Sequence, residues 1–177
     1  MRLIPNFLSL LRILLVFPII YFLQSELYLL AALLFLISSS TDFFDGYLAR
    51  RYELESELGA FLDLIADKIL VVTILVWLVF IYANQALAIL SILIILREII
   101  ITSFRYFLVL NNAKAELIKA NKYGKLKTAF QFLSVFLLIL SPLYNNFYLT
   151  LSLILLLVST LISYFSLAIY FMNWIKK

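Results

Sequence analysis

The stretch TDFFDGYLARRYELESELGAFLDLIADK, residues 41–68, places a group of aspartates in an otherwise apolar chain. Asp42 and Asp45 precede a short polar segment, and Asp63 and Asp67 follow it. Long apolar runs flank the stretch on both sides, so the four carboxylates belong to segments that can enter a membrane. Carboxylates are rare in such segments and need a partner there. This stretch therefore bears on both the arrangement of the helices and their chemistry.

The composition is typical of an integral membrane protein. Of the 177 residues, 66% are hydrophobic, whereas soluble domains are nearer half apolar. Six apolar segments are each about long enough to cross ~30 Å of hydrocarbon at a rise of ~1.5 Å per residue. They span residues 7–24, 27–50, 58–82, 86–109, 123–141 and 147–174. We therefore expect one all-α, polytopic membrane domain over residues 1–177, with six transmembrane helices.

The first apolar segment is marginal as a membrane span because it contains Arg12. An alternative is that residues 1–12 begin as a separate short helix lying in the membrane interface, with Pro5 at its start. Arg12 would then either extend to the interface or face a cytoplasmic cavity. The sequence does not decide between these two placements.

Basic residues are concentrated on one side of the expected bundle. The breaks near residues 24–26, 82–86 and 141–147 contain no Lys or Arg. The opposite side holds Arg2, Arg50, Arg51, Lys114, Lys119, Lys122, Lys176 and Lys177. The positive-inside rule then places both termini and the acidic site at the cytoplasmic face of the cell (inner) membrane. The net charge of +4 would favour anionic membrane lipids and substrates there, and no separate basic domain indicates a nucleic-acid partner.

The aspartates form two pairs that each share one helix face. Asp42 and Asp45 are three residues apart, and Asp63 and Asp67 are four apart. Both pairs lie ~8–15 Å from the cytoplasmic ends of their helices, and the short connection makes these helices antiparallel neighbours. Without cysteine or histidine, only oxygen ligands are available, which indicates Mg²⁺, Mn²⁺ or Ca²⁺. Several carboxylates together could hold a pair of such ions.

Separate pairing of the aspartates is the alternative, for example Asp67 with Lys68 or an aspartate with Arg50. It is less favoured because adjacent residues on a helix do not face each other, and the matching depths would be unexplained. Gly46 and Gly59, two of only three glycines in the chain, flank the acidic pairs. A small residue there allows either close helix packing or the approach of a substrate.

The motif DxxDGxxAR at residues 42–50, followed after eight residues by GxxxDxxxD at residues 59–67, resembles the signature of the CDP-alcohol phosphotransferase family. The resemblance implies transfer of a substituted phosphate from a CDP-linked donor to an alcohol, with release of CMP. It implies two bound Mg²⁺ or Mn²⁺ ions and a homodimer. The implied metal ligands are Asp42, Asp45, Asp63 and Asp67, with Asp67 also the general base for the acceptor hydroxyl. The implied CDP-binding residues are Asp42, Gly46, Ala49, Arg50 and Gly59.

Residues 97–105, REIIITSFR, place Glu98 and Arg105 on one helix face. Arg105 lies toward the cytoplasmic end, where Lys125 and Lys127 open the next helix. An arginine and one or two lysines beside the carboxylates would bind a phosphate-bearing acceptor. The alternative for the two lysines is that they extend to the membrane interface.

Blocks spread over residues 4–131 resemble, in order, the branch of this family that makes phosphatidylglycerol phosphate. These blocks are IPNFLSLLRILL, TDFFDGYLARR, GAFLDLIADK, REIIITSFR and YGKLKTAFQ, whereas the last helix has only generic hydrophobicity. The branch implies CDP-diacylglycerol as donor and sn-glycerol 3-phosphate as acceptor, with Arg105, Lys125 and Lys127 binding the acceptor phosphate. Arg97, near mid-membrane, needs a carboxylate or backbone partner and forms either a structural ion pair or a substrate contact.

Other functions remain open at this point. One is a relative that uses serine, inositol phosphate or phosphatidylglycerol as acceptor, although an uncharged headgroup has less use for a positive pocket. Another is a divalent-cation transporter, but the acids gather near one face and only Glu26 lies on the other. A purely structural subunit is least favoured because unpaired buried carboxylates are costly.

Overall fold

The computed structural model describes residues 3–51, 57–110, 122–144 and 146–175. The side chains of residues 3–8, 41–51, 57–61, 63, 64, 109, 122, 123, 125 and 173 lie outside the described part. The described residues form helices and no strands: α1 (Leu3–Gln24), α2 (Tyr28–Arg51), α3 (Glu57–Tyr82), α4 (Gln85–Leu110), α6 (Lys122–Leu140), the 3₁₀ turn η1 (Ser141–Leu143) and α7 (Asn146–Ile175). The all-α prediction is confirmed, and the largest difference in helix limits is at α1, which begins at Leu3 rather than at residue 7.

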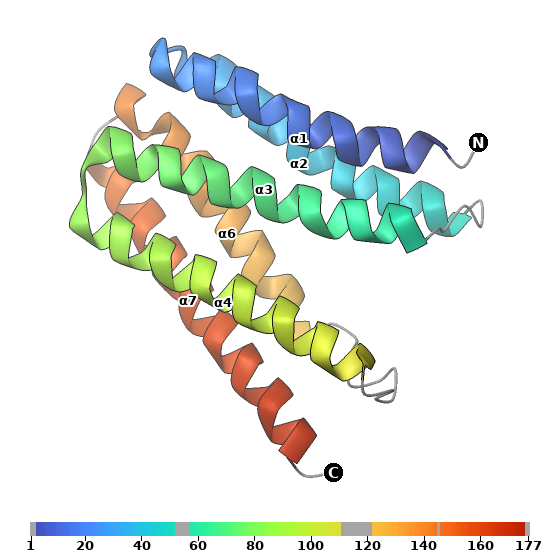
Figure 1. Ribbon diagram of the computed structural model, residues 1–177. Helices are drawn as coiled ribbons and strands as arrows, with labels where there is room; N and C mark the ends of the chain where they lie inside the picture. Colours follow the sequence, from blue (N-terminus) through green and yellow to red (C-terminus); the bar gives the residue numbers. More distant parts are fainter. Residues whose placement is uncertain (1–2, 52–56, 111–121, 145, 176–177) are drawn as a thin grey trace.

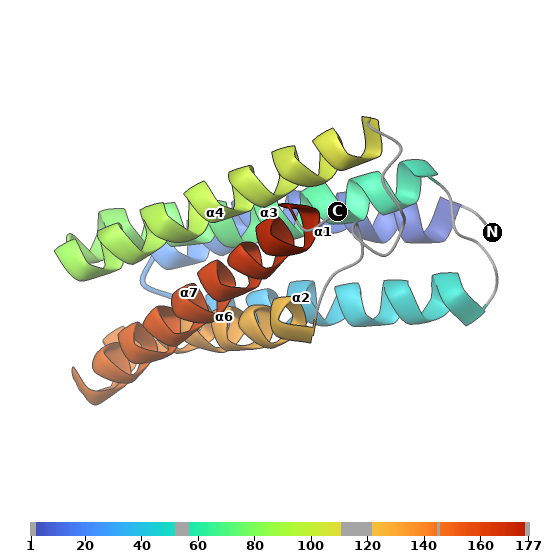
Figure 2. The same ribbon diagram turned by 90° about the horizontal axis from the view of Figure 1, so that it is seen from below.

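The helices form one bundle in which α1 packs against both α2 and α3. Helices α2 and α3 run antiparallel, as predicted, but they contact each other much less than either contacts α1 (Figure 1). Helix α6 packs most closely against α7 and also reaches α2 and α3, while α4 packs against α3 and α7. Figure 2 shows α2 and α6 on the opposite side of the molecule from α4. The two acidic helices are therefore held together largely through α1.

Helix α1 is continuous from Leu3 to Gln24 and contains Pro18. A separate interfacial helix ending near Arg12 is therefore not what the structure shows. Arg12 lies in the middle of one long helix, and its side chain is fully buried. Because Arg12 is buried, its side chain does not extend to the membrane interface.

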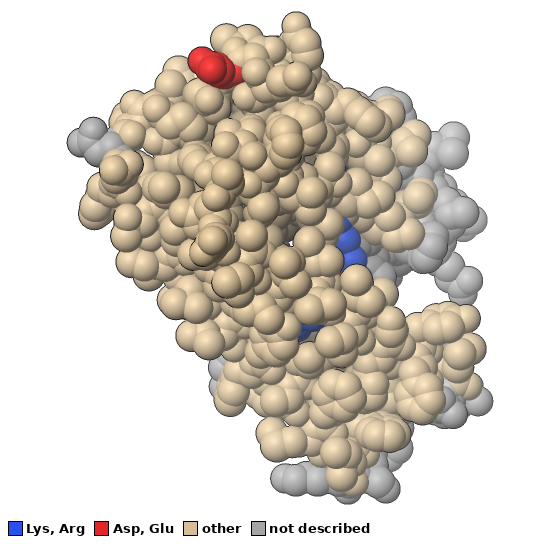
Figure 3. Space-filling model, turned by 60° about the vertical axis from the view of Figure 1, so that its left-hand side comes forward, with Lys and Arg blue, Asp and Glu red and all other residues tan. Residues whose placement is uncertain are grey.

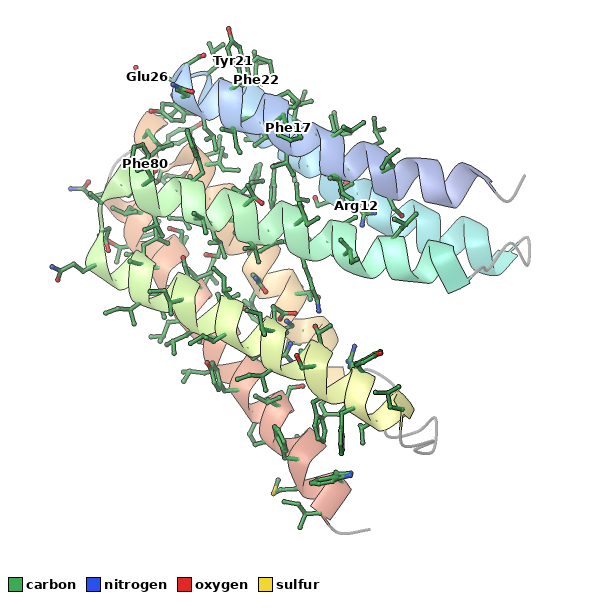
Figure 4. All side chains as sticks on the ribbon, viewed as in Figure 1. Arg12, Phe17, Tyr21, Phe22, Glu26 and Phe80 are labelled. Carbon is green, nitrogen blue, oxygen red and sulfur yellow. The ribbon has the colours of Figure 1, made fainter. Side chains whose placement is uncertain are left out.

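The bundle has the surface of a membrane-embedded protein. In the part of the chain that the structure describes, four apolar segments are long enough to cross a membrane, namely Ile65–Tyr82, Gln85–Leu108, Leu126–Leu143 and Asn146–Met172. Within the described residues, α1 and α2 contain shorter apolar segments, Ser9–Gln24 and Tyr28–Ser40. The face drawn in Figure 3 is almost entirely uncharged, and large side chains such as Phe17 and Phe80 are exposed on the outer surface (Figure 4). The polytopic prediction is confirmed, and four of the six expected spans have the required length.

Small polar residues lie where α6 and α7 approach most closely. Ser134 Oγ donates a hydrogen bond to the carbonyl oxygen of Ser152 at 2.7 Å. Ser159 Oγ donates to the carbonyl oxygen of Lys127 at 3.0 Å. Small side chains allow two helix backbones to approach closely in a membrane, and their hydroxyls bond across the contact. This contact fixes the position of Lys127 relative to α7.

Two tight turns join the helices at the end of the bundle away from the acidic stretch. Glu26, between α1 and α2, has φ 60°, and Ala83, between α3 and α4, has φ 46°. At the first turn the Leu27 N–H donates to the carbonyl oxygen of Phe22 at 2.8 Å, which closes α1 with a residue in the left-handed region. These turns hold α1 beside α2 and α3 beside α4.

Asn84 caps the start of α4, because its Oδ1 accepts a hydrogen bond from the Leu87 N–H at 3.1 Å. We expect Asn84→Ala to lower the free energy of unfolding by about 1 kcal/mol, since the N–H loses its side-chain acceptor. Asn84→Asp, which keeps an acceptor oxygen, is the matched control. Thermal unfolding in detergent measures both variants, and an unchanged Tm for Asn84→Ala would show that the cap contributes nothing.

Candidate active site

A cavity of about 250 Å³ lies between α3, α4, α6 and α7. Among the described residues, its charged lining consists of Lys68, Arg97, Arg105, Lys127, Asp67 and Glu98. Four cations against two carboxylates make the lining positive overall. The structure thus brings Arg105 and Lys127 to the same cavity as Asp67, as the sequence predicted, and the excess positive charge suits an anionic ligand.

Asp67 of α3 lies at the edge of this cavity, and its side chain is 37% exposed. Its Oδ1 accepts a hydrogen bond from Arg12 Nη1 at 2.5 Å. Arg12 is labelled in Figure 4, where it lies on the inner side of α1 facing α3. The sequence left the placement of Arg12 open. Asp67 therefore forms an ion pair with a basic side chain. The ion pair is with Arg12 and not with the adjacent Lys68 that the sequence alternative named.

Lys68 points toward α4 instead. Its Nζ donates a hydrogen bond to Thr102 Oγ1, and the Thr102 hydroxyl donates to the carbonyl oxygen of Glu98 at 2.7 Å. Thr102 therefore connects Lys68 to the backbone of α4. This contact positions a lysine ammonium on the cavity wall next to Asp67.

Glu98 neutralises part of the positive charge. Its Oε1 accepts hydrogen bonds from Arg97 Nη1 at 2.9 Å and from Lys127 Nζ. Arg97 Nε also donates to the carbonyl oxygen of Ser163 at 3.3 Å. Arg97 thus has both a carboxylate and a backbone partner, in agreement with the structural ion pair that the sequence offered as one option. Lys127 is buried against Glu98, so it does not extend to the membrane interface.

Arg105 is oriented by α7. Its Nη2 donates to Tyr170 Oη at 3.0 Å, and its guanidinium carbon lies 5.4 Å from the centre of the Tyr170 ring. Phe104 packs against Phe171, with ring centres 4.4 Å apart, and against Trp174 at 5.8 Å, which holds α4 and α7 together nearby. Arg105 Nε is buried and has no hydrogen-bond partner in the part of the chain that the structure describes. The Nε–H therefore remains for an anionic ligand.

The other predicted site residues lie on helices with side chains outside the described part. They are Asp42, Asp45, Gly46, Ala49 and Arg50 on α2, Gly59 and Asp63 on α3, and Lys125 on α6. The helical backbone confirms that each aspartate pair lies within one helix. The described side chains include only Asp67 of the four carboxylates, and they contain no group of three metal ligands. The metal and CDP sites therefore stay predictions, for which carboxylate oxygens are suitable donors to a hard divalent cation.

Sequence analysis missed several residues that line the cavity. Gln131 lies one helical turn after Lys127 on α6, and Ser166 lies one turn before Tyr170 on α7. The spacing of four residues in each pair was a usable signal, because such residues share a helix face. The sequence did not indicate that α7 contributes a wall, since that depends on how α4 and α7 pack.

Comparison with known proteins gives the same assignment as the motif. A family model described as CDP-alcohol phosphatidyltransferase matches residues 2–171. A protein of Wigglesworthia glossinidia brevipalpis is 35% identical over 171 residues, which is 95% of this chain and 92% of that protein. Proteins of Pseudomonas fluorescens (36% over 148 residues, 78% and 73% of the two chains) and Rickettsia typhi (38% over 144 residues, 79% and 78%) are also similar. All three are named CDP-diacylglycerol–glycerol-3-phosphate 3-phosphatidyltransferase. Because the family model covers nearly the whole sequence, the chain belongs to the CDP-alcohol phosphatidyltransferase family.

Proposed function

We propose that this protein is a membrane-embedded phosphatidyltransferase that makes phosphatidylglycerol phosphate and CMP from CDP-diacylglycerol and sn-glycerol 3-phosphate. The names of the relatives, at 35, 36 and 38% identity, support this reaction. The single observation that carries the choice of acceptor is the cavity, where Arg105, Lys68 and Lys127 surround a space next to Asp67. A phosphate-bearing acceptor makes fuller use of these cations than zwitterionic serine, which brings one carboxylate and an ammonium of its own.

The acceptor phosphate is the part of the substrate that the cavity recognises best. The guanidinium of Arg105 is planar, is held by Tyr170 through Nη2, and keeps its Nε–H for a phosphate oxygen. Lys68 and Lys127 add positive charge on the facing walls. Hydrogen bonds between charged partners in a partly buried site are stronger than neutral ones, so these contacts favour a dianion. Lys125 is proposed as a further phosphate-binding residue.

Asp67 is proposed as the general base. In the proposed step, an acceptor hydroxyl gives its proton to an Asp67 carboxylate oxygen while the acceptor oxygen forms a bond to the phosphorus of the phosphatidyl group. The bond from that phosphorus to the oxygen of CMP breaks, and CMP leaves with the electron pair. Asp67 is suited to this step because it lies at the edge of the cavity and its side chain is partly exposed.

The donor is proposed to bind between α2 and α3. Asp42, Asp45, Asp63 and Asp67 would hold two Mg²⁺ or Mn²⁺ ions, which when bound neutralise the diphosphate of the donor. The proposed CDP-binding residues are Asp42, Gly46, Ala49, Arg50 and Gly59. The presence of both acidic segments on helices connected through α1 supports this arrangement.

The orientation and assembly are also proposals. We place both termini and the cavity at the cytoplasmic face of the inner membrane, because the basic residues gather at that end, and we propose a homodimer from the family resemblance. The chain has no cysteine, so single cysteines can report the orientation. Glu26→Cys should react with an impermeant maleimide added outside intact cells, and Lys177→Cys should not. The reverse pattern would invert the assignment.

The reaction is tested by CMP release from the purified protein in detergent, with CDP-diacylglycerol, Mg²⁺ and one acceptor at a time. The acceptors are glycerol 3-phosphate, serine, inositol phosphate and phosphatidylglycerol. Release with glycerol 3-phosphate alone, abolished by a chelator, is the expected result. Release with another acceptor would overturn the assignment of the acceptor, and no release with any acceptor under Mg²⁺ or Mn²⁺ would overturn the proposed function.

A further inference from the structure

We infer that Arg12 is a positioning residue for the reaction, which acts by fixing the Asp67 carboxylate in the orientation that takes the acceptor's proton. The inference rests on the proposed function, because it assigns Arg12 a role through the proposed base. It starts from the contact between two helices that are distant in sequence, in which Arg12 Nη1 of α1 lies 2.5 Å from Asp67 Oδ1 of α3.

The placement of Arg12 is costly unless the ion pair compensates for it. Arg12 is the only charged residue of α1, and its side chain is 0% exposed. Its neighbours Leu10 and Leu14 are exposed on the outer surface, whereas Val16 and Ile19 are buried on the inner face with Arg12. A charged side chain inside a membrane bundle needs a partner, and arginine near a membrane surface usually extends to water instead. In this helix the guanidinium turns inward to Asp67.

Arg12 lies outside the described lining of the cavity. No residue of α1 lines the cavity in the described part of the chain, whereas Asp67 does. Arg12 therefore reaches the cavity edge through the Asp67 carboxylate and is not itself part of the described lining. A partly exposed aspartate can adopt several rotamers, and a bond from a buried guanidinium to Oδ1 restricts it to one of them. In the proposed role, Arg12 acts on the reaction through Asp67.

The test compares Arg12→Gln and Arg12→Lys with the wild-type protein by measuring kcat for CMP release and KM for both substrates. For Arg12→Gln we expect kcat to fall by about 10- to 100-fold, because small displacements of a catalytic group cost this much, with both KM values within about threefold. Arg12→Lys, which keeps a charged donor, should recover part of the loss. In an Asp67→Asn background, Arg12→Gln should lower the residual rate no further, because the base is already absent.

Tyr82→Phe is the matched control for a purely structural effect. Tyr82 Oη donates to the carbonyl oxygen of Leu138 at 2.8 Å and lies away from the cavity, so its loss should lower Tm and leave kcat unchanged. A second measurement needs no activity. In chelator, the Tm losses of Arg12→Gln and Asp67→Asn should be non-additive in the double variant, because each single change removes a charge from the same ion pair.

Three results would overturn the inference while the wild-type protein is active. They are a kcat for Arg12→Gln within twofold of wild type, a loss that adds fully to that of Asp67→Asn, and a change confined to KM. Should Arg12→Gln not fold, Arg12→Lys carries the same test, with a reduced kcat at a near-wild-type Tm supporting the role and an unchanged kcat overturning it. A wild-type protein that releases no CMP would instead overturn the proposed function, and the role of Arg12 with it.

Discussion

Asp67→Asn should lower kcat for CMP release by roughly 1,000-fold, because an amide cannot take the proton of the acceptor hydroxyl. Asparagine keeps the size of the side chain and one oxygen for the bond from Arg12, so the shape of the cavity edge is retained. We expect a smaller effect on both KM values than on kcat, since the lost interaction operates in the transition state. Steady-state kinetics with purified protein in detergent measures the three constants.

The control for this prediction is the stability of the same variant. The Arg12 guanidinium is fully buried, and removing the charge of its partner should lower Tm without preventing folding. Size-exclusion profiles and thermal unfolding therefore accompany the kinetics. Near-wild-type turnover by a folded Asp67→Asn protein would show that another group accepts the proton.

Arg105→Ala should raise KM for glycerol 3-phosphate by roughly 100-fold, with a much smaller change in KM for CDP-diacylglycerol. The guanidinium provides a buried Nε–H that has no partner within the described residues. Losing a charge-assisted hydrogen bond of about 3 kcal/mol corresponds to a roughly 100-fold loss of affinity. Arg105→Lys should recover only part of the affinity, because an ammonium does not reproduce the planar donor geometry of the guanidinium. Competition by inorganic phosphate with glycerol 3-phosphate gives an independent measure of the same site.

Tyr170→Phe is the matched control for Arg105, since it removes only the hydroxyl that accepts from Nη2 and keeps the ring beneath the guanidinium. The KM of Tyr170→Phe for glycerol 3-phosphate should rise less than about tenfold, because this variant loses one hydrogen bond between Arg105 and a neutral hydroxyl oxygen. If Arg105→Ala leaves that KM unchanged, the acceptor phosphate binds elsewhere and the lysines become the first residues to test.

The helices were predictable because a segment that crosses the hydrocarbon must be a long apolar run, and the connections between such segments are polar. The limits of α4 and α7 differ from those expected by a single residue at each end. α1 was harder because Arg12 divides its apolar run, and only the structure shows that a partner on α3 allows the helix to continue through it. The prediction of six spans was based on helix length, and the length of the second expected span included its acidic turns. The apolar segment of α2 in the described part ends at Ser40.

The site was predictable to the extent that its residues lie in local motifs. Arg105 and Lys127 were placed near Asp67 from helix depth alone, and all three line one cavity. Their partners were not predictable, because each partner lies on another helix. Lys127 pairs with Glu98 of α4, and Tyr170 of α7 orients Arg105. Depth along a helix follows from sequence, whereas the rotation of one helix against its neighbour depends on packing.

The burial of Arg12 has a consequence for the biogenesis of the protein. Its carboxylate partner lies 55 residues later in the chain, on the third helix. At synthesis rates of ~5–20 residues per second, Arg12 is made about 3–11 seconds before Asp67. During that interval the guanidinium has a hydrated headgroup region available and no Asp67 to bind, so the Arg12–Asp67 ion pair can hold α1 in place only after α3 arrives. Helix α1 thus gains this ion pair only from a helix that is synthesised later than itself.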